Sequence, residues 1–146
     1  MKKIMTFFSL ILLVTQLAFA GDLITKDMSK LPAAAREVLT KHFPNAKVSH
    51  IKIDKDALKS PSYDVMLDNG TKVEFNGKGE WTEVDCQKSA VPASVVPAAI
   101  SKYITDNFKG EKIVKIEKDR KGNEIKLSNG TELKFDSMGK FIKLDH

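Results

Sequence analysis

The sequence contains only one cysteine, Cys86, and only three histidines, His42, His50 and His146, among its 146 residues. A single cysteine cannot form an internal disulfide, which excludes the disulfide-stapled class of small exported proteins. The histidines do not follow any spacing typical of metal ligands, and no cysteine cluster accompanies them. We therefore expect neither a structural disulfide nor a metal site.

Motifs of known catalytic sites are also missing. There is no Gly-x-Ser-x-Gly, no phosphate-binding glycine-rich loop and no Cys–His pairing around Cys86. Acidic pairs such as Glu83 and Asp85 could bind calcium weakly, but they lie outside any loop with calcium-ligand spacing. The sequence thus predicts a protein that is not an enzyme and has no cofactor.

Long apolar runs are absent except at the N-terminus. Lys2 and Lys3 precede an apolar run from Phe7 to Leu17, and Ala18-Phe19-Ala20 forms a small-x-small cleavage signal. This pattern predicts a signal peptide over residues 1–20, too short for a membrane span, with an uncleaved N-terminal anchor as the alternative. We expect an exported protein, either periplasmic or extracellular.

A strong excess of one charge is missing as well. Loss of residues 1–20 removes Lys2 and Lys3 and lowers the net charge from +5 to +3. Lysine and glutamate alternate along the predicted strands instead of forming a basic patch, so we expect no nucleic-acid partner. We expect a monomer or weak dimer without stable membrane insertion after signal cleavage. Cys86 is either a partly buried free thiol or forms a disulfide with a partner or with a second copy of the chain.

The chain does contain an internal repeat. The segment Leu67-Asp68-Asn69-Gly70-Thr71-Lys72-Val73-Glu74-Phe75 returns as Leu127-Ser128-Asn129-Gly130-Thr131-Glu132-Leu133-Lys134-Phe135. The similarity extends outward to both sides, and the first copy has a longer loop at 57–61. Two copies are too few for a solenoid, so we expect both to share one sheet.

Each copy begins with a predicted helix. Apolar residues spaced four apart form one stripe at Leu31, Ala35, Leu39 and Phe43, and a second stripe at Val96, Ile100, Ile104 and Phe108. This spacing is typical of a helix with one buried face. Pro32 and Pro97 fit the first helical turn, where the missing N–H has no cost.

Four strands are predicted after each helix. Alternating apolar residues place them at about 47–54, 62–67, 71–76 and 80–85, and at about 112–119, 122–127, 131–136 and 140–145. Only a three-residue loop, Asp68-Asn69-Gly70, pairs Val65 with Val73 and keeps both on one face. The same reasoning applies to Ser128-Asn129-Gly130. It also aligns Phe75 with Trp81, and Phe135 with Phe141, on the face toward the helices.

The opposite face of the predicted sheet is polar. The alternation also places Thr82, Glu124 and Glu132 on the polar face. Five apolar residues do not fit this two-sided pattern: Val48, Ile113, Val84, Ile142 and Leu144. Such a face is usually just solvated, but it is also the surface on which we expect partner binding. The residues predicted to bind a partner are His50, Lys52, Asp64, Met66, Lys72, Glu74, Lys115, Glu117, Lys126 and Lys134.

These motifs resemble the secreted PepSY-like family, which is also described as β-lactamase-inhibitor-like. The similarity rests on the segments Val91 to Ile100 and Ser128 to Asp136, and it covers residues 31–146. It implies an α+β fold built from a tandem repeat, in which each unit has a helix followed by four antiparallel strands. Together the strands would form one continuous curved antiparallel sheet with the helices on one face. The predicted division is a signal peptide at 1–20, a polar segment at 21–30, repeat 1 at 31–86, a linker at 87–95 and repeat 2 at 96–146.

The resemblance also implies that proteins of this kind bind or restrain secreted enzymes. The leading hypothesis is an exported binding protein, an inhibitor or regulator of a peptidase or another enzyme, that uses the open sheet face. The namesake inhibitors have disulfides and an aromatic-rich open face, from which this sequence departs. One alternative is a carrier of a small ligand or peptide, with a pocket near Trp81, Phe141, Ile142 and Met66. Another is self-assembly through edge strands.

Overall fold

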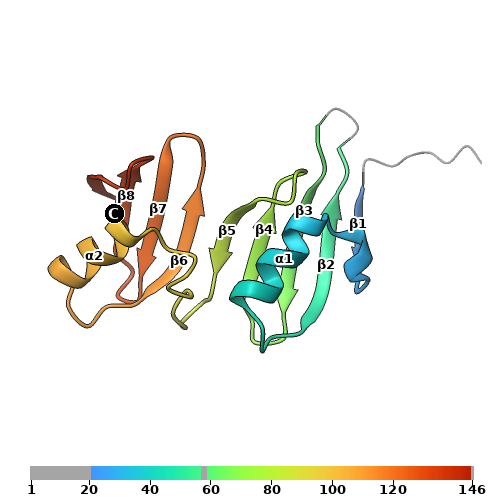
Figure 1. The fold of residues 1–146 in the computed structure, drawn as a ribbon, viewed down its shortest axis with the longest axis horizontal. Coiled ribbons are helices and arrows are strands. Elements are labelled where there is room, and N and C mark those ends of the chain that lie inside the picture. The colour runs from blue at the N-terminus through green and yellow to red at the C-terminus, as the bar shows by residue number, and fades with distance from the viewer. Residues whose placement is uncertain (1–20, 57–58, 146) are drawn as a thin grey trace, which may run out of the picture.

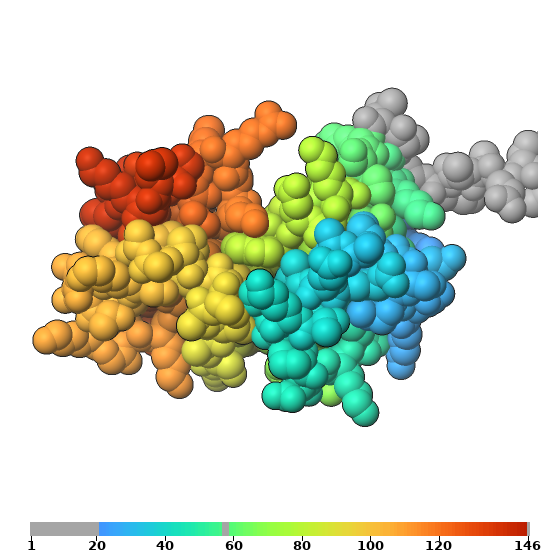
Figure 2. Space-filling view, viewed as in Figure 1, coloured from blue at the N-terminus to red at the C-terminus, as the bar shows by residue number. Residues whose placement is uncertain are grey.

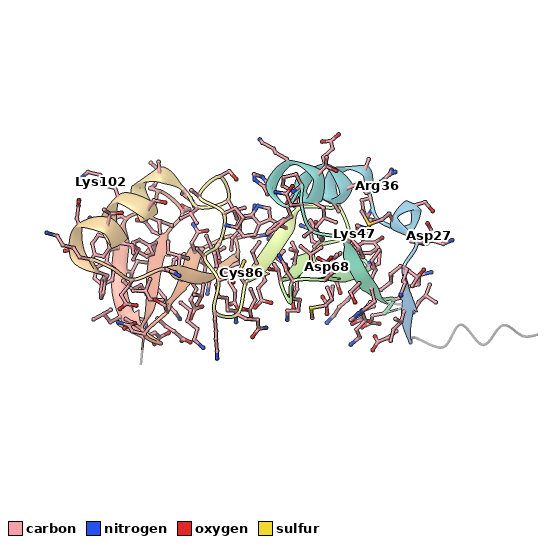
Figure 3. All side chains as sticks on the ribbon, turned by 90° about the horizontal axis from the view of Figure 1, so that it is seen from below. Asp27, Arg36, Lys47, Asp68, Cys86 and Lys102 are labelled. Carbon is pink, nitrogen blue, oxygen red and sulfur yellow. The ribbon has the colours of Figure 1, made fainter. Side chains whose placement is uncertain are left out.

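The fold is one nine-stranded antiparallel sheet with two α-helices, described by a computed structural model for residues 21–56 and 59–145. The strands are paired in chain order from β1 to β9 (Figure 1). Both helices lie on the same side of the sheet (Figure 3). We call the other side the open face. The predicted signal peptide, residues 1–20, and the loop tip at 57–58 lie outside the described residues.

The elements follow the predicted order closely. After β1 (Asp22–Thr25) and a 3-10 helix (Met28–Lys30), the chain forms α1 (Ala33–His42), β2 (Val48–Asp54), β3 (Ser62–Leu67), β4 (Lys72–Phe75) and β5 (Trp81–Asp85). It continues with α2 (Ala98–Asn107), β6 (Ile113–Lys118), β7 (Gly122–Leu127), β8 (Glu132–Asp136) and β9 (Phe141–Asp145). Strand β1 was not predicted, because residues 21–30 show no strand pattern.

The hairpin loops have the predicted register. Val65 lies opposite Val73, and Tyr63 lies opposite Phe75. Gly70 closes the loop with a φ of +86°, a left-handed conformation that glycine adopts without steric cost. The Asn69 side chain accepts a hydrogen bond from the Thr71 amide at 3.0 Å. The loop at Ser128-Asn129-Gly130 has the same geometry, so the Asn-Gly-Thr motif fixes which side chains enter the core.

Four β-bulges explain the residues that did not fit the two-sided pattern. The extra residues are Ser49, Thr82, Val114 and Ile142, each inserted where the ladder shifts register by one position. A bulge reverses the alternation beyond it. Val84 consequently lies opposite Val73 and is fully buried, and Leu144 lies opposite Leu133. The expectation that Thr82 occupies a regular open-face position is wrong, because Glu83 takes that place opposite Glu74.

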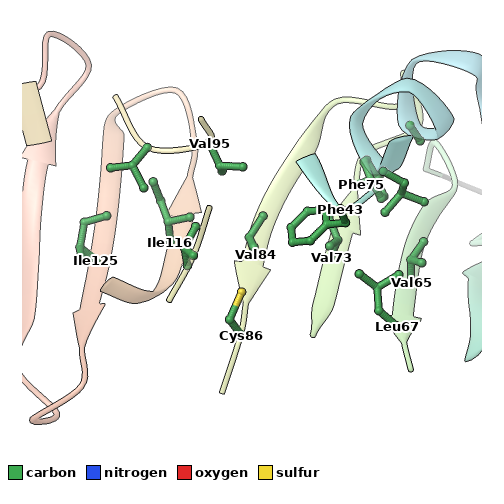
Figure 4. Packing of buried hydrophobic residues seen from close by; sticks show 14 of the residues in the cluster. Phe43, Val65, Leu67, Val73, Phe75, Val84, Cys86, Val95, Ile116 and Ile125 are labelled. Carbon is green, nitrogen blue, oxygen red and sulfur yellow. The ribbon is translucent and has the colours of Figure 1, made fainter. Parts of the chain in front are cut away.

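One hydrophobic core runs under both helices. It includes the predicted stripes of α1 and α2 together with the inward side chains of the strands. Val91 and Val95, in the segment predicted as a linker, are also buried, so this segment fills the space between the helices (Figure 4). Val84 of β5 and Ile116 of β6 lie directly opposite each other in the centre of the sheet. The core is therefore continuous across the sheet.

The continuous core predicts cooperative unfolding. Replacing the fully buried Ile116 with alanine should lower the free energy of unfolding by about 2–5 kcal/mol, because a cavity opens at the centre of the sheet. Ile142→Ala is the matched control, since Ile142 is 57% exposed, and it should change stability by less than about 0.5 kcal/mol. Chemical denaturation of both variants followed by circular dichroism would measure this. Two separate transitions would show that the two halves unfold independently.

Candidate functional site

All ten residues predicted to bind a partner lie on the open face. They belong to two rows of cross-strand neighbours that run across the sheet. The first row runs through His50, Met66, Lys72, Asp85, Lys115 and Lys126. The second row runs through Lys52, Asp64, Glu74, Glu83, Glu117, Glu124 and Lys134. The structure thus brings the ten residues to one face, while their role in binding remains a prediction.

The second row contains five consecutive carboxylates. We call Asp64, Glu74, Glu83, Glu117 and Glu124 the acidic row. Each of these residues lies directly opposite the next one, on strands β3 to β7. Like charges in directly opposite positions destabilise a sheet. The row is therefore an electrostatic cost that other interactions must offset.

Two lysines of the neighbouring row offset part of this repulsion. Lys72 Nζ lies 2.8 Å from Glu74 Oε1 and 3.0 Å from Glu83 Oε2. Lys115 Nζ lies 3.0 Å from Glu83 Oε1 and 2.8 Å from Glu117 Oε1. Three carboxylates thus share two ammonium groups. Asp64 and Glu124, at the two ends of the row, form no ion pair within the described part of the chain.

Glu83 is the centre of this network. Its side chain is only 9% exposed, whereas Lys72 and Lys115 are about one-third exposed. Burial alone would raise the pKa of Glu83, but interactions with Glu117, Lys115 and Lys72 outweigh it and lower the pKa to about 2. Oε2 of Glu83 has an ion pair with Lys72 but no hydrogen bond of good geometry among the described residues.

The carboxylates beside Glu83 titrate in the opposite direction. Burial raises the pKa of Glu74, and the nearby Glu83 adds to this effect. The Glu83 carboxylate is the main cause that raises the pKa of Glu117. The network therefore keeps its negative charge on Glu83 and protonates first at its neighbours. An approaching cation would relieve the repulsion between these carboxylates.

A pocket of about 440 Å³ lies at the β6–β9 end of the acidic row. Glu83, Glu117 and Glu124 line it together with Ile142, the bulge residue of β9. Its size falls within the range of small-ligand pockets. The four residues predicted to form one apolar pocket are not brought together, because Phe141 stacks on Tyr103 of α2 while Met66 lies on the open face.

The described residues do not form a metal cage. Within residues 21–56 and 59–145, no group of three or more His, Cys, Asp or Glu side chains is placed to hold a metal ion. Cys86 is 6% exposed, and burial raises the pKa of its thiol. A buried thiol with a raised pKa is a poor nucleophile for disulfide formation. The Cys86 thiol is thus poorly suited to covalent chemistry.

Sequence analysis missed the role of Glu83, the most buried carboxylate of the acidic row. The simple alternation of side chains assigned its open-face position to Thr82, because the bulge in β5 has no clear sequence signal. The signal that could have found it is Val84, an apolar residue that otherwise falls on the polar face.

Glu83 should make stability depend on pH. Its pKa is lower in the folded chain, about 2, than its ordinary value of 4.5, so its contribution is complete above pH 4.5 and is lost as the pH falls toward 2. Glu83→Gln should therefore destabilise the protein by about 1–3 kcal/mol at pH 7, and this difference from the wild type should shrink below pH 4.5. Denaturant unfolding at pH 7, 4 and 2.5 would measure it.

The exposed Glu37 on α1 provides the control. Glu37→Gln should change stability by less than about 0.5 kcal/mol at pH 7. A Glu83→Gln variant as stable as the wild type at pH 7, or one whose deficit stays constant down to pH 2.5, would contradict the assignment of Glu83 as the centre of the network.

Solved structures of three bacterial proteins are similar to this chain. One from Bacteroides vulgatus, described as a "putative periplasmic protein of unknown function", has 52% sequence identity and a TM-score of 0.82, with 86% of this chain and 100% of that chain covered. A second from the same species has 45% identity and a TM-score of 0.79 over 86% and 97% of the chains. A third, from Bacteroides thetaiotaomicron, is described as a "putative calcium-regulated periplasmic protein" and has 44% identity and a TM-score of 0.81 over 86% and 97%.

These relatives confirm the predicted export to the periplasm. No helix in the described residues is long and apolar enough to span a membrane. No curated protein is similar enough to the sequence to count as a relative.

The family comparison matches more than half of the sequence. Residues 61–143 match the family described as "Putative beta-lactamase-inhibitor-like, PepSY-like". This range contains strands β3 to β8, the start of β9, helix α2 and both Asn-Gly-Thr loops, so it covers the motifs on which the predicted resemblance rests. The chain belongs to the PepSY-like family of periplasmic proteins.

Proposed function

We propose that the protein is a non-enzymatic binding protein of the periplasm, and that its open face holds a partner protein with basic side chains. The observation that carries the proposal is the acidic row, in which five carboxylates lie in directly opposite positions on five strands. Only two lysines lie between them, and both are already used in ion pairs. Arginine or lysine side chains of a partner would lie against the carboxylates and relieve their repulsion.

The ten predicted residues have unequal roles in this proposal. Lys72 and Lys115 form ion pairs with Glu83 and so fix the position of its carboxylate. Asp64 and Glu124, free of ion pairs with other described residues, are better placed to contact a partner. The family description as inhibitor-like suggests that the partner is an enzyme, such as a secreted peptidase, that the protein inhibits or regulates.

We also infer that the two helix-plus-four-strand units are tandem copies of one unit. Support comes from the matching positions of Phe75 and Phe135, which pair with Trp81 and Phe141 across equivalent hairpins. Because the acidic row crosses from one unit to the other, a partner on this surface would contact both copies.

One relative is described as calcium-regulated, which raises calcium binding as a candidate for this chain. The donor geometry does not fit, because the central carboxylates are bound to lysines and no described cluster is placed to hold a metal ion. The alternative of a small-ligand or peptide carrier is supported by pockets around Trp81.

Affinity capture tests the proposed open-face function. Residues 21–146 would be immobilised and exposed to periplasmic extract of the source cells at low salt. We expect a retained protein that elutes as the salt concentration rises, because exposed charge pairs are screened. The double variant Asp64→Asn, Glu124→Gln should reduce its affinity by about tenfold or more.

The control carries the same change of charge on the helices. Glu37→Gln combined with Asp106→Asn should change the affinity by less than about twofold, because both residues lie on the other side of the sheet. Equal retention by the open-face variant and the wild type would show that the acidic row does not bind the partner.

A further inference from the structure

The sheet opens at its centre, where β5 and β6 meet. These strands pair only at Glu83 with Glu117, Val84 with Ile116, and Asp85 with Lys115. Trp81 and Thr82 of β5, and Lys118 at the end of β6, lie beyond the ladder. Figure 1 shows the two strands diverging there, and Figure 2 shows a notch between the β4–β5 and β6–β7 turns.

Trp81 lies at this notch, where it packs against the core beside α1 and is only partly buried. In the second half, Phe141 is covered by Tyr103, whose ring stacks on it at a centroid distance of 4.8 Å. The residue at the same position of α1 is Val38, the sixth residue of its helix as Tyr103 is of α2. Valine has no ring to stack on the indole, and a pocket of about 350 Å³ lined by Val38 lies beside Trp81.

A lysine from the other half covers part of this indole. Lys118 Nζ lies 4.0 Å from the centre of the Trp81 ring, a cation–π contact. Burial lowers the pKa of Lys118, and no carboxylate of the described residues forms an ion pair with it. The nearby Glu80 carboxylate acts on this pKa in the opposite direction, but it lies too far away to form an ion pair.

Two further cations lie around the adjoining pocket. This pocket has a volume of about 440 Å³ and is lined by Trp81, Lys118, Lys78 and Arg120, among others. Lys78 and Arg120 also form no ion pair within the described residues. The two acidic residues there also have hydrogen bonds. The Glu80 carboxylate accepts one from the Asn76 side chain at 3.3 Å, and Asp119 accepts hydrogen bonds from the amides of Lys121 and Gly122. Positive charge therefore faces the notch beside a flat aromatic surface.

We propose that the notch binds an organic anion, a carboxylate or phosphate group attached to a planar ring. The ring lies against Trp81 of the first half, and the anion contacts Lys118 and Arg120 of the second half. This site is separate from the acidic row, which attracts the opposite charge. The same chemistry occurs in a free aromatic acid or phosphate ester and in a peptide that ends in phenylalanine.

Titrations with three probes separate the contributions of ring and charge. Phenyl phosphate carries both, inorganic phosphate carries only the charge, and benzyl alcohol carries only the ring. Trp81 is the only tryptophan, so its indole N–H signal in NMR reports on the notch alone. We expect phenyl phosphate to shift this signal with an affinity at least about tenfold higher than either fragment. Similar shifts from all three probes, or none from phenyl phosphate, would overturn the proposal.

Peptide probes distinguish the two sources. The tripeptide Ala-Ala-Phe with a free carboxylate should bind more tightly than its C-terminal amide if the notch accepts peptide ends. If only phenyl phosphate shifts the indole signal, the ligand is a free small molecule.

Variants test the assigned residues. Lys118→Met keeps the length of the side chain but removes its charge, and we expect it to weaken phenyl phosphate binding by about tenfold or more. Lys109→Met, an exposed lysine in the turn after α2, is the matched control and should bind like the wild type. Unfolding curves would confirm that both variants remain folded. Equal binding by Lys118→Met and the control would overturn the role of Lys118.

Discussion

The short ladder between β5 and β6 is the constraint on which the structure depends. Three residue pairs join the halves into one sheet. The side chains of these pairs connect the two halves differently on the two faces of the sheet. On the helix side, Val84 meets Ile116 and makes the core continuous (Figure 4). On the open face, Glu83 of β5 meets Glu117 of β6, so the charge network crosses from one half to the other. A longer ladder would close the notch, and a shorter one would expose the core.

The electrostatics of the open face follow from this junction. Glu83 is buried because strands with long side chains flank it on both sides, and a buried carboxylate stays charged only if cations compensate for lost solvation. Lys72 and Lys115 reach it from neighbouring strands. A fully compensated network would need as many lysines as carboxylates. Lys52 and Lys134 lie opposite the two end carboxylates, Asp64 and Glu124, but form no ion pair with them. The open face therefore keeps carboxylates that no described lysine binds directly, which is the reason to connect it with binding.

Most of the fold was predictable because local rules determine it. The four-residue spacing of Leu31, Ala35 and Leu39 predicts the buried stripe of α1, and the Asn69-Gly70 turn fixes the register of Val65 and Val73. The bulges were not predictable, because an extra residue in a strand changes only pairing and leaves composition unchanged. The extra residue Thr82 moves Glu83 to the open face and Val84 to the face toward the helices. The ten open-face residues were assigned to the correct face. No bulge in their own strands reverses the alternation at their positions.

The two halves differ most where each helix meets an aromatic side chain. In the second half, Tyr103, Phe135 and Phe141 pack edge-to-face and stacked, which closes that end of the core. In the first half, the small Val38 side chain of α1 lies at the position of Tyr103, and the larger ring of Trp81 lies at the position of Phe141. Lys118 of the other half lies over the Trp81 indole. If only stability governed these positions, an aromatic residue in place of Val38 would cover the indole as Tyr103 covers Phe141. Lys118 instead lies over the indole in a cation–π contact, and its position beside a notch gives the first half a surface that the second half lacks.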